Sequence, residues 1–174
     1  MHDPEQVFAA LRLNDGDCFV DIGCGPGDYS LEAAIRIGKT GLVYSLDRDN
    51  GMINALAVIA DNRGVTNINA ITADMTVSLP LESQYADVVF MATVLHGVNL
   101  GKHGDMLFNE IRRILKPGGR MAIVECKKED QPWGPPIHIR LSPDQIREVV
   151  LPFGFKETDL VDLGKNYLIQ FIKV

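Results

Sequence analysis

The sequence has few cysteines, no long apolar run and no basic start. Its three cysteines, Cys18, Cys24 and Cys126, fit no CxxC or cysteine–histidine spacing, so we expect buried free thiols in a reducing compartment and no metal site. No apolar run approaches the roughly 20 residues that a membrane-spanning helix needs. The first five residues lack the positive charge of a secretory signal. These absences predict a cytoplasmic protein without a membrane span.

Positive charge is also scarce. The chain has 17 lysines and arginines against 23 aspartates and glutamates, a formal net charge of −6, and it has no dense basic stripe. Nucleic-acid affinity comes mostly from neutralised phosphates, so we expect no nucleic-acid partner. Domains commonly run to about 100–200 residues. We therefore expect residues 1–174 to form a single domain.

What the sequence does contain is a regular alternation of short apolar runs and segments of helical period. This alternation is typical of an α/β fold in which helices cover both faces of a parallel sheet. Residues 86–92 form an unbroken apolar run, which predicts a central strand near Val89 that is covered on both faces. The five expected parallel strands are residues 18–23, 41–47, 68–74, 86–92 and 120–126. The expected helices are residues 4–11, a segment with Asp28 as N-cap, a segment with the buried stripe Met52, Ile53, Leu56, Ala57 and Ala60, and a segment around residues 106–115.

The last third of the chain departs from this alternation. Residues 127–141 are rich in proline and glycine and have no clear period, so we expect a loop or lid. Residues 142–145, Ser-Pro-Asp-Gln, have the spacing of a capping box with proline at the first helical position, which predicts a helix to about residue 152. Two strand-like runs, residues 156–163 and 167–174, are joined by a short link. Such a link fits an antiparallel hairpin and is too short for a parallel crossover.

A glycine-rich turn, residues 21–27 with the sequence DIGCGPG, lies where the first strand gives way to a helix. Glycines there let the backbone turn sharply and approach a ligand. The glycines are spaced GxGxG rather than the GxGxxG of dinucleotide sites, and Asp21 and Asp28 flank the turn without a nearby lysine or arginine. These carboxylates would repel a diphosphate and attract a ligand with an ammonium and a sulfonium group. S-adenosylmethionine carries both groups.

Two more acidic residues end the next two strands. Asp47 follows the glycine turn by about 20 residues, the spacing at which an acidic side chain reaches a ribose diol in nucleotide-binding βαβ units. Asp74 ends the third strand. Each aspartate by itself is equally well explained as a cap of a strand or of the following helix. Together with Asp21 they share the carboxyl edge of the sheet, where open α/β sheets bind ligands, so a ligand site is favoured.

These motifs resemble those of the class I S-adenosylmethionine-dependent methyltransferases along nearly the whole chain. The segments that carry the resemblance are residues 20–27, 43–47, 72–75, 79–81, 86–90 and 114–120. Within the family, the chain is similar to the subgroup related to the ubiquinone/menaquinone C-methyltransferases, partly through residues 134–136 and 140–142. The resemblance implies a Rossmann-like, doubly wound sheet of seven strands in the order 3-2-1-4-5-7-6 with strand 7 antiparallel, which agrees with the hairpin expected at the C-terminus.

The resemblance also implies S-adenosyl-L-methionine as the cofactor. By position, Asp47 would hold the ribose, Asp74 would accept the adenine amino group, and Met52 and Met75 would pack on adenine. Met52 fits the buried stripe of its helix almost equally well. The set of cofactor-binding residues that the resemblance implies is Asp21, Gly23, Cys24, Gly25, Asp47, Arg48, Met52, Asp74, Met75 and Ala92.

Methyl transfer from a sulfonium is an in-line displacement, in which the protein mainly aligns the nucleophile and excludes water. A base is needed only when the nucleophile must lose a proton. The candidates near the carboxyl edge are His96, Glu125 and His138, of which we favour His96. Each has a plain alternative: His96 bonding the backbone at the strand end, Glu125 pairing with Lys127 or Lys128, and His138 lying in solvent.

Two further expectations concern histidines. His103 is expected to be an exposed residue before a helix. A metal site built from His96, His138 and Glu125 has no diagnostic spacing, so no metal is expected.

The expected substrate is a small or medium organic molecule. The Asp/Asn-Pro-Pro-Tyr/Phe motif of the DNA amino-group methylases is replaced by Ala-Thr-Val-Leu at residues 92–95. Only a short segment precedes the first strand, so we expect a pocket that is open, or closed by residues 132–140 or by the second subunit of a homodimer. The alternatives are a non-catalytic, cofactor-binding partner subunit of a larger complex and a nicotinamide-dependent reductase.

Overall fold

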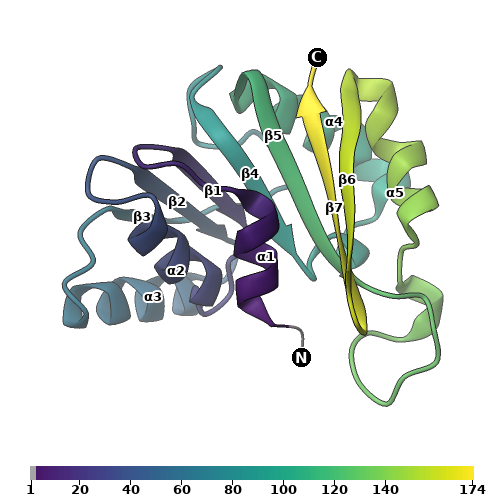
Figure 1. The fold of residues 1–174 in the computed structure, drawn as a ribbon, viewed down its shortest axis with the longest axis horizontal. Coiled ribbons are helices and arrows are strands. Elements are labelled where there is room, and N and C mark those ends of the chain that lie inside the picture. Colours follow the sequence, from purple (N-terminus) through teal and green to yellow (C-terminus); the bar gives the residue numbers. More distant parts are fainter. Residues whose placement is uncertain (1–2) are drawn as a thin grey trace.

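Seven strands form one mixed sheet in the computed structural model, which describes residues 3–174 (Figure 1). The strand order is β3-β2-β1-β4-β5-β7-β6. Strands β1 to β5 pair in parallel, and β7 is antiparallel to both β5 and β6. The predicted order and the C-terminal hairpin are confirmed. The strands are β1 (Cys18–Ile22), β2 (Leu42–Asp47), β3 (Ile68–Thr72), β4 (Ala86–Ala92), β5 (Leu115–Cys126), β6 (Phe155–Leu163) and β7 (Asn166–Lys173).

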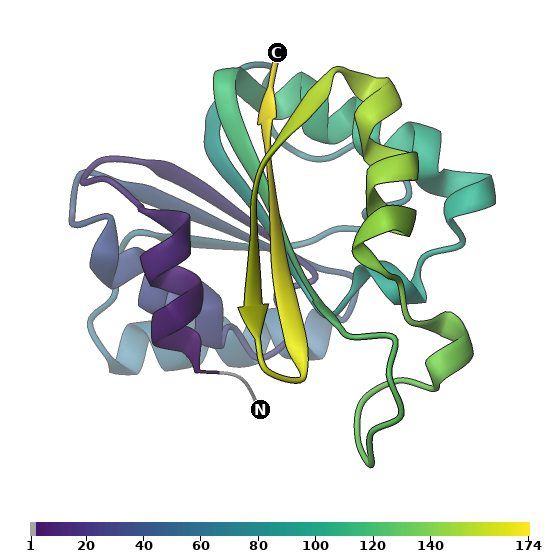
Figure 2. The same cartoon turned by 45° about the vertical axis from the view of Figure 1, so that its right-hand side comes forward.

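Helices cover both faces of this sheet (Figure 2). Three helices, α1, α2 and α3, lie on one face, and α4 and α5 lie on the other. The split follows the alternation of side chains along β4, where Val88 and Phe90 pack with α1 and α2, and Val89 and Met91 pack with α4 and α5. The predicted central position of β4 is confirmed. The helices are α1 (Pro4–Leu11), α2 (Asp28–Arg36), α3 (Asn50–Asn62), α4 (Leu100–Ile114) and α5 (Pro143–Val150), with short 3₁₀ turns η1 (Leu95–Gly97), η2 (Ile137–Ile139) and η3 (Leu151–Phe153).

Several predicted boundaries need correction. Gly27 is the N-cap of α2 and Asp28 is its first residue, because the left-handed backbone of Gly27 already turns the chain into the helix. Helix α5 ends at Val150, before the 3₁₀ turn η3. The capping box of α5 is confirmed, with Ser142 and Gln145 bonding each other's backbone. Strand β5 begins at Leu115, five residues earlier than predicted, because Leu115 pairs with Ala86 ahead of a bulge.

The predicted buried stripe of α3 is only partly correct. Ile53, Leu56 and Ala60 are buried, whereas Met52 is 41% exposed and Ala57 is exposed. Asp49 caps α3 directly after β2, which sets the rotation of its first turn and leaves Met52 at the surface near the carboxyl edge.

Helix α1 packs on a face of the sheet. Its Val7, Phe8 and Leu11 are buried in the same cluster as the α2 residues, and its Ala10 carbonyl accepts a hydrogen bond from Gln170 of β7 (3.1 Å). The helix predicted over residues 4–11 is therefore confirmed, and it does not lie over the ends of the strands (Figure 1).

The segment after β5 extends beyond the carboxyl end of the sheet (Figures 1 and 2). Arg140, which is buried, organises it by donating hydrogen bonds to the carbonyls of Lys127 (3.1 Å), Glu129 (2.7 Å), Trp133 (3.0 Å) and Pro135 (2.7 Å). The planar guanidinium has donors in several directions at once, so one side chain can hold four carbonyls. The predicted loop therefore has a defined shape.

All three cysteines are buried and unpaired. None of the helices within residues 3–174 combines the length and apolar content needed to cross a membrane.

Replacing Arg140 by Met should loosen this segment selectively. Because the four carbonyls would lose a charged donor, amide hydrogen exchange across residues 127–141 should accelerate about tenfold or more, while exchange in β1 and β4 stays unchanged. Lys128→Met is the matched control, since Lys128 is exposed and donates to the Gln145 side chain at the surface. Equal exchange in the two variants would contradict the role given to Arg140.

Candidate functional site

The glycines of the turn between β1 and α2 have two different structural roles. A Cβ atom on Gly23 would meet the Val94 side chain at 2.5 Å, and one on Gly27 would collide with Leu56. A Cβ on Gly25 would meet nothing within 4 Å. Gly23 and Gly27 therefore permit close packing, whereas Gly25, with φ of 52°, leaves an open space above the turn.

Strand β2 holds this turn in place. The Gly25 N–H donates to Asp47 Oδ2 (2.9 Å), and the Asp49 N–H donates to Asp47 Oδ1 (2.9 Å). The Leu46 carbonyl accepts from the Gly23 N–H (2.7 Å). A carboxylate has about four lone-pair sites, so Asp47 can still accept hydrogen bonds from a ligand such as a diol.

Asp21 lies beneath the turn as a buried acid. The Ser30 hydroxyl donates to Asp21 Oδ2 (2.6 Å), and the Ser45 hydroxyl donates in turn to Ser30 (2.7 Å). Burial raises the pKa of Asp21 to about 7; the Ser30 hydrogen bond opposes this rise and the Asp47 charge adds to it. Neutral Asp21 is therefore well populated near neutral pH, and a nearby cation would favour its ionised form.

Two cavities meet over the turn. The larger, about 460 Å³, is bounded by Asp47, Asp74 and the start of α4. The smaller, about 270 Å³, is bounded by Asp21, Asp28 and the end of β4. Gly23 and Val94 line both cavities. The arrangement suits an elongated ligand with two chemically different halves.

The structure brings most of the predicted cofactor residues together. The larger cavity contains Gly23, Asp47, Arg48, Asp74 and Met75, and the smaller contains Asp21, Gly23, Cys24, Gly25 and Ala92. Met52 lies in neither lining.

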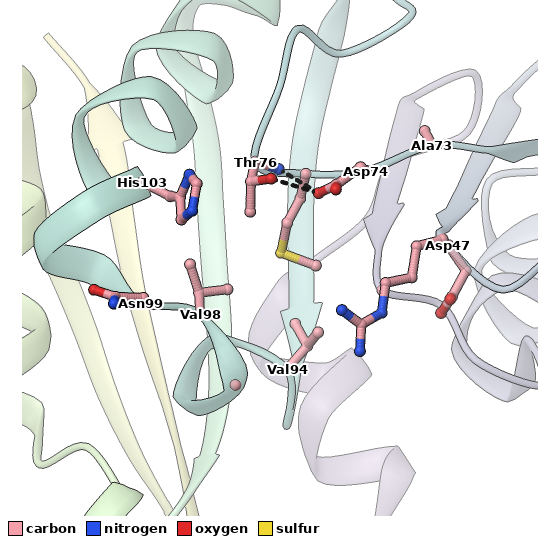
Figure 3. A pocket seen from close by; sticks show the side chains of 12 residues that line it. Asp47, Ala73, Asp74, Thr76, Val94, Val98, Asn99 and His103 are labelled. Atoms are coloured by element: carbon pink, nitrogen blue, oxygen red, sulfur yellow. Dashed lines mark hydrogen bonds between the residues drawn. The ribbon is translucent and has the colours of Figure 1, made fainter.

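Asp74 lies two residues beyond the end of β3 at Thr72, rather than ending that strand as predicted. It presents a fixed carboxylate to the larger cavity (Figure 3). The backbone N–H and the hydroxyl of Thr76 both donate to Asp74 Oδ1 at 2.8 Å. These bonds, with smaller contributions from the charges of Arg48 and His103, lower the pKa of Asp74. Asp74 therefore stays ionised, with Oδ2 still able to accept a hydrogen bond.

The expectation for His103 is wrong. His103 lies within the first turns of α4, is partly buried, and lines the larger cavity together with Asn99 (Figure 3). The helix starts earlier than predicted because Asn99 caps it, its side chain accepting from the Lys102 N–H (3.2 Å). An asparagine before a helical segment is an N-cap signal, so the sequence contained a means of finding this boundary.

Other residues of the site have weaker sequence signals. Tyr29 and Thr93 line the smaller cavity, and Val94 lies between the two cavities. Thr93 has φ of 54°, which is unusual for a β-branched residue. Such a strained backbone at the end of β4 is visible only in three dimensions.

His96 and Glu125 form a partly buried pair that lines neither cavity, although Val94 and Gly97, close to His96 in the chain, line the larger one. His96 Nδ1 donates to Glu125 Oε2 (2.8 Å), and the His96 backbone N–H donates to Glu125 Oε1 (3.1 Å). Glu125 is fully buried, and its hydrogen bond to the ring raises the pKa of His96, against the opposing effect of burial. The carboxylate holds Nδ1 as a donor, which leaves Nε2 of the neutral ring as the basic nitrogen.

This pair settles two alternatives. Glu125 does not pair with Lys127 or Lys128, because Lys127 bonds Asp162 (2.8 Å) and Lys128 bonds Gln145 (3.1 Å). His96 does not merely bond the backbone, since its ring meets a carboxylate.

His138 is separate from this pair. It lies on η2, in the segment after β5, with an exposed side chain, as its solvated alternative predicts. Within residues 3–174, no three His, Cys, Asp or Glu side chains are grouped so as to hold a metal ion.

Comparisons with known proteins point to one family. A family model described as a methyltransferase domain matches residues 13–154. A demethylmenaquinone methyltransferase from Lactobacillus johnsonii is 27% identical over 128 residues, which cover 74% of this chain and 51% of the relative. A ubiquinone/menaquinone biosynthesis C-methyltransferase from Paraburkholderia xenovorans is 31% identical over 137 residues, covering 78% and 53%. The chain thus spans about half the length of these curated relatives.

A solved structure is similar over nearly the whole chain. The crystal structure of a S-adenosylmethionine-dependent methyltransferase from Aquifex aeolicus matches with a TM-score of 0.91 and 26% identity, covering 99% of this chain and 90% of that one.

The burial of Asp21 leads to a prediction about protein stability that can be tested without a ligand. The pKa of Asp21 is raised from 3.8 to about 7 in the folded chain, so the protonated carboxyl favours folding at low pH. This contribution to the free energy of unfolding is lost as the pH rises from about 4 to about 7. Asp21→Asn should therefore raise the free energy of unfolding at pH 8 by about 2–4 kcal/mol and change it little at pH 4. Urea unfolding at the two pH values measures this. An equal effect of the substitution at both would contradict the assignment.

Proposed function

Because the chain belongs to the methyltransferase family, and within it to the class I enzymes that use S-adenosylmethionine, we propose that it transfers a methyl group from this cofactor to a small or medium organic substrate. The observation that carries the proposal is the pair of cavities joined at Gly23, with Asp21 in one and Asp47 and Asp74 in the other. We also propose that residues 1–174 act as a single cofactor-binding domain.

The residues present fit the cofactor in both halves. In the smaller cavity, Asp21 would attract the ammonium of the methionine part, and the open space above Gly25 would let the backbone approach it. In the larger cavity, Asp47 would accept from the ribose diol and Asp74 from the adenine amine. The remaining proposed contacts that line the cavities are the backbone of Gly23 and Cys24, Arg48 beside the ribose, Met75 against adenine, and Ala92 at the end of β4. Met52 lines neither cavity, and we propose that it packs on adenine from its exposed position on α3.

When bound, S-adenosylmethionine supplies a methyl group that is electrophilic because it sits on a sulfonium. The protein aligns the nucleophile with this group and keeps water away. Where the nucleophile carries a proton, we propose that His96 Nε2 accepts it and that Glu125 positions the ring through Nδ1. His138, on the segment after β5, is proposed only as a group that reaches the substrate from that side.

We also propose an acceptor to test first, the kinds of partner and the cellular location. The demethylated quinone in the name of the Lactobacillus johnsonii relative is the first acceptor to test. The net charge of −6 supports the proposal that nucleic acid is not a partner. The three buried, unpaired thiols support a cytoplasmic location. A homodimer remains one way to cover the pocket, because α1 packs on a face of the sheet.

Calorimetry with S-adenosylhomocysteine tests cofactor binding. Asp47→Ala should weaken binding about 10- to 100-fold, since it removes charge-assisted hydrogen bonds to the ribose and releases the Gly25 N–H. Asp159→Ala, at an exposed position on β6, is the matched control and should bind as the wild type does. Absence of heat with the wild type, or tighter binding of NADH, would refute the proposal. A methylated product in an acceptor screen would exclude a non-catalytic subunit.

A second experiment tests the His96–Glu125 pair without needing the substrate. The pKa of His96, followed by NMR, should lie above 6.5 in the wild type, because Glu125 stabilises the imidazolium. Glu125→Gln should lower this pKa below the wild-type value, and His96→Gln assigns the signal. With any acceptor whose nucleophile loses a proton, His96→Gln should reduce kcat about 10²- to 10⁴-fold. A His96 pKa that is unchanged by Glu125→Gln would refute the pairing.

A further inference from the structure

The start of α4 forms a wall of the larger cavity that the proposed cofactor contacts leave unused. Val98, Asn99 and His103 line this wall, and Asp74 and Thr76 lie on the opposite side (Figure 3). His103 is the basic side chain that α4 contributes to this lining, Arg48 is a second basic side chain of the lining, and the charges of both lower the pKa of Asp74.

The position of His103 is fixed by the helix start. The Asn99 side chain caps the helix, and the His103 backbone N–H donates to the Asn99 carbonyl (2.9 Å). The preceding turn η1 is held by buried Leu95 and by the bond between His96 and Glu125. The imidazole thus extends from a rigid segment, which is what a recognition contact requires.

The two walls present complementary hydrogen-bonding groups. Asp74 is ionised, so it only accepts, and Thr76 already donates to its Oδ1. A ligand group next to Asp74 must therefore donate. An imidazole offers an N–H donor to a group that accepts. A flat heterocycle with an amine next to a ring nitrogen would satisfy both walls at once, and adenine has this arrangement.

We propose that His103 determines specificity for the nucleobase, donating a hydrogen bond from its ring to the adenine nitrogen, N1 or N7, that adjoins the amine bound by Asp74. This inference rests on the proposed function, since it concerns the same cavity. It adds a residue from α4 to a proposed binding site that otherwise draws on the ends of β1, β2 and β4, the segment after β3, and Met52 of α3.

The test is calorimetric binding of S-adenosylhomocysteine and of its 1-deaza and 7-deaza analogues, in which a ring nitrogen is replaced by C–H. His103→Ala should weaken binding of the parent compound about three- to tenfold, the value of one neutral hydrogen bond. The wild type should show a similar loss with one of the two analogues. His103→Ala should show no further loss with that analogue, because both changes remove the same bond. His103→Gln, which keeps an N–H donor, should recover part of the affinity.

Lys102→Ala is the matched control, because Lys102 is exposed on the same turn of α4. It should bind all three compounds as the wild type does. Binding of S-adenosylhomocysteine by His103→Ala within twofold of the wild type would overturn the inference. So would a loss of affinity, for His103→Ala with the sensitive analogue, that equals the product of the loss from the variant and the loss from the analogue. Both results leave the proposed function intact, whereas failure of the wild type to bind S-adenosylhomocysteine removes the proposed function itself.

Discussion

The Asp47 carboxylate is the group on which the geometry of the site depends. It accepts hydrogen bonds from the backbone N–H of Gly25, in the turn before α2, and from the backbone N–H of Asp49, in the turn before α3. The carboxylate therefore connects the start of α2 with the start of α3. These bonds exist only because β1 and β2 pair in parallel with Ile22 opposite Leu46. Strand register therefore determines where the backbone at Gly25 opens, and the two cavities on either side of Gly23 follow from it.

The same carboxylate adds to the electrostatic cost of ionising Asp21. Asp21 is buried, and the charge of Asp47 adds to the rise of its pKa. A second anion such as diphosphate would increase this cost, whereas a cation would reduce it by favouring the ionised form of Asp21. The ammonium and sulfonium of S-adenosylmethionine fit this balance. We therefore expect selectivity between ligand classes to come from the charge pattern in the turn, in addition to its shape.

Sequence patterns that span only a few residues predicted the fold well and the site only in part. The apolar run of β4 and the capping box at Ser142 are signals within a few residues, and both are confirmed. The pairing of His96 with Glu125 was not foreseen, because it joins the segment after β4 to the end of β5 and depends on their parallel register. His103 was misplaced for a related reason: its exposure follows from the helix start at Asn99, which periodicity alone did not locate.

The end of β4 couples the two cavities to the proposed base. Thr93, held in the left-handed region by a bond from its N–H to the Val124 carbonyl (2.8 Å), turns the chain out of the sheet. This turn places Val94 against Gly23 and, within three residues, brings His96 to Glu125. The wall between the cavities and the orientation of the imidazole therefore share one strained residue. A change of backbone at Thr93 would move both together, so the packing of Val94 against Gly23 and the direction of His96 Nε2 are set by the same constraint.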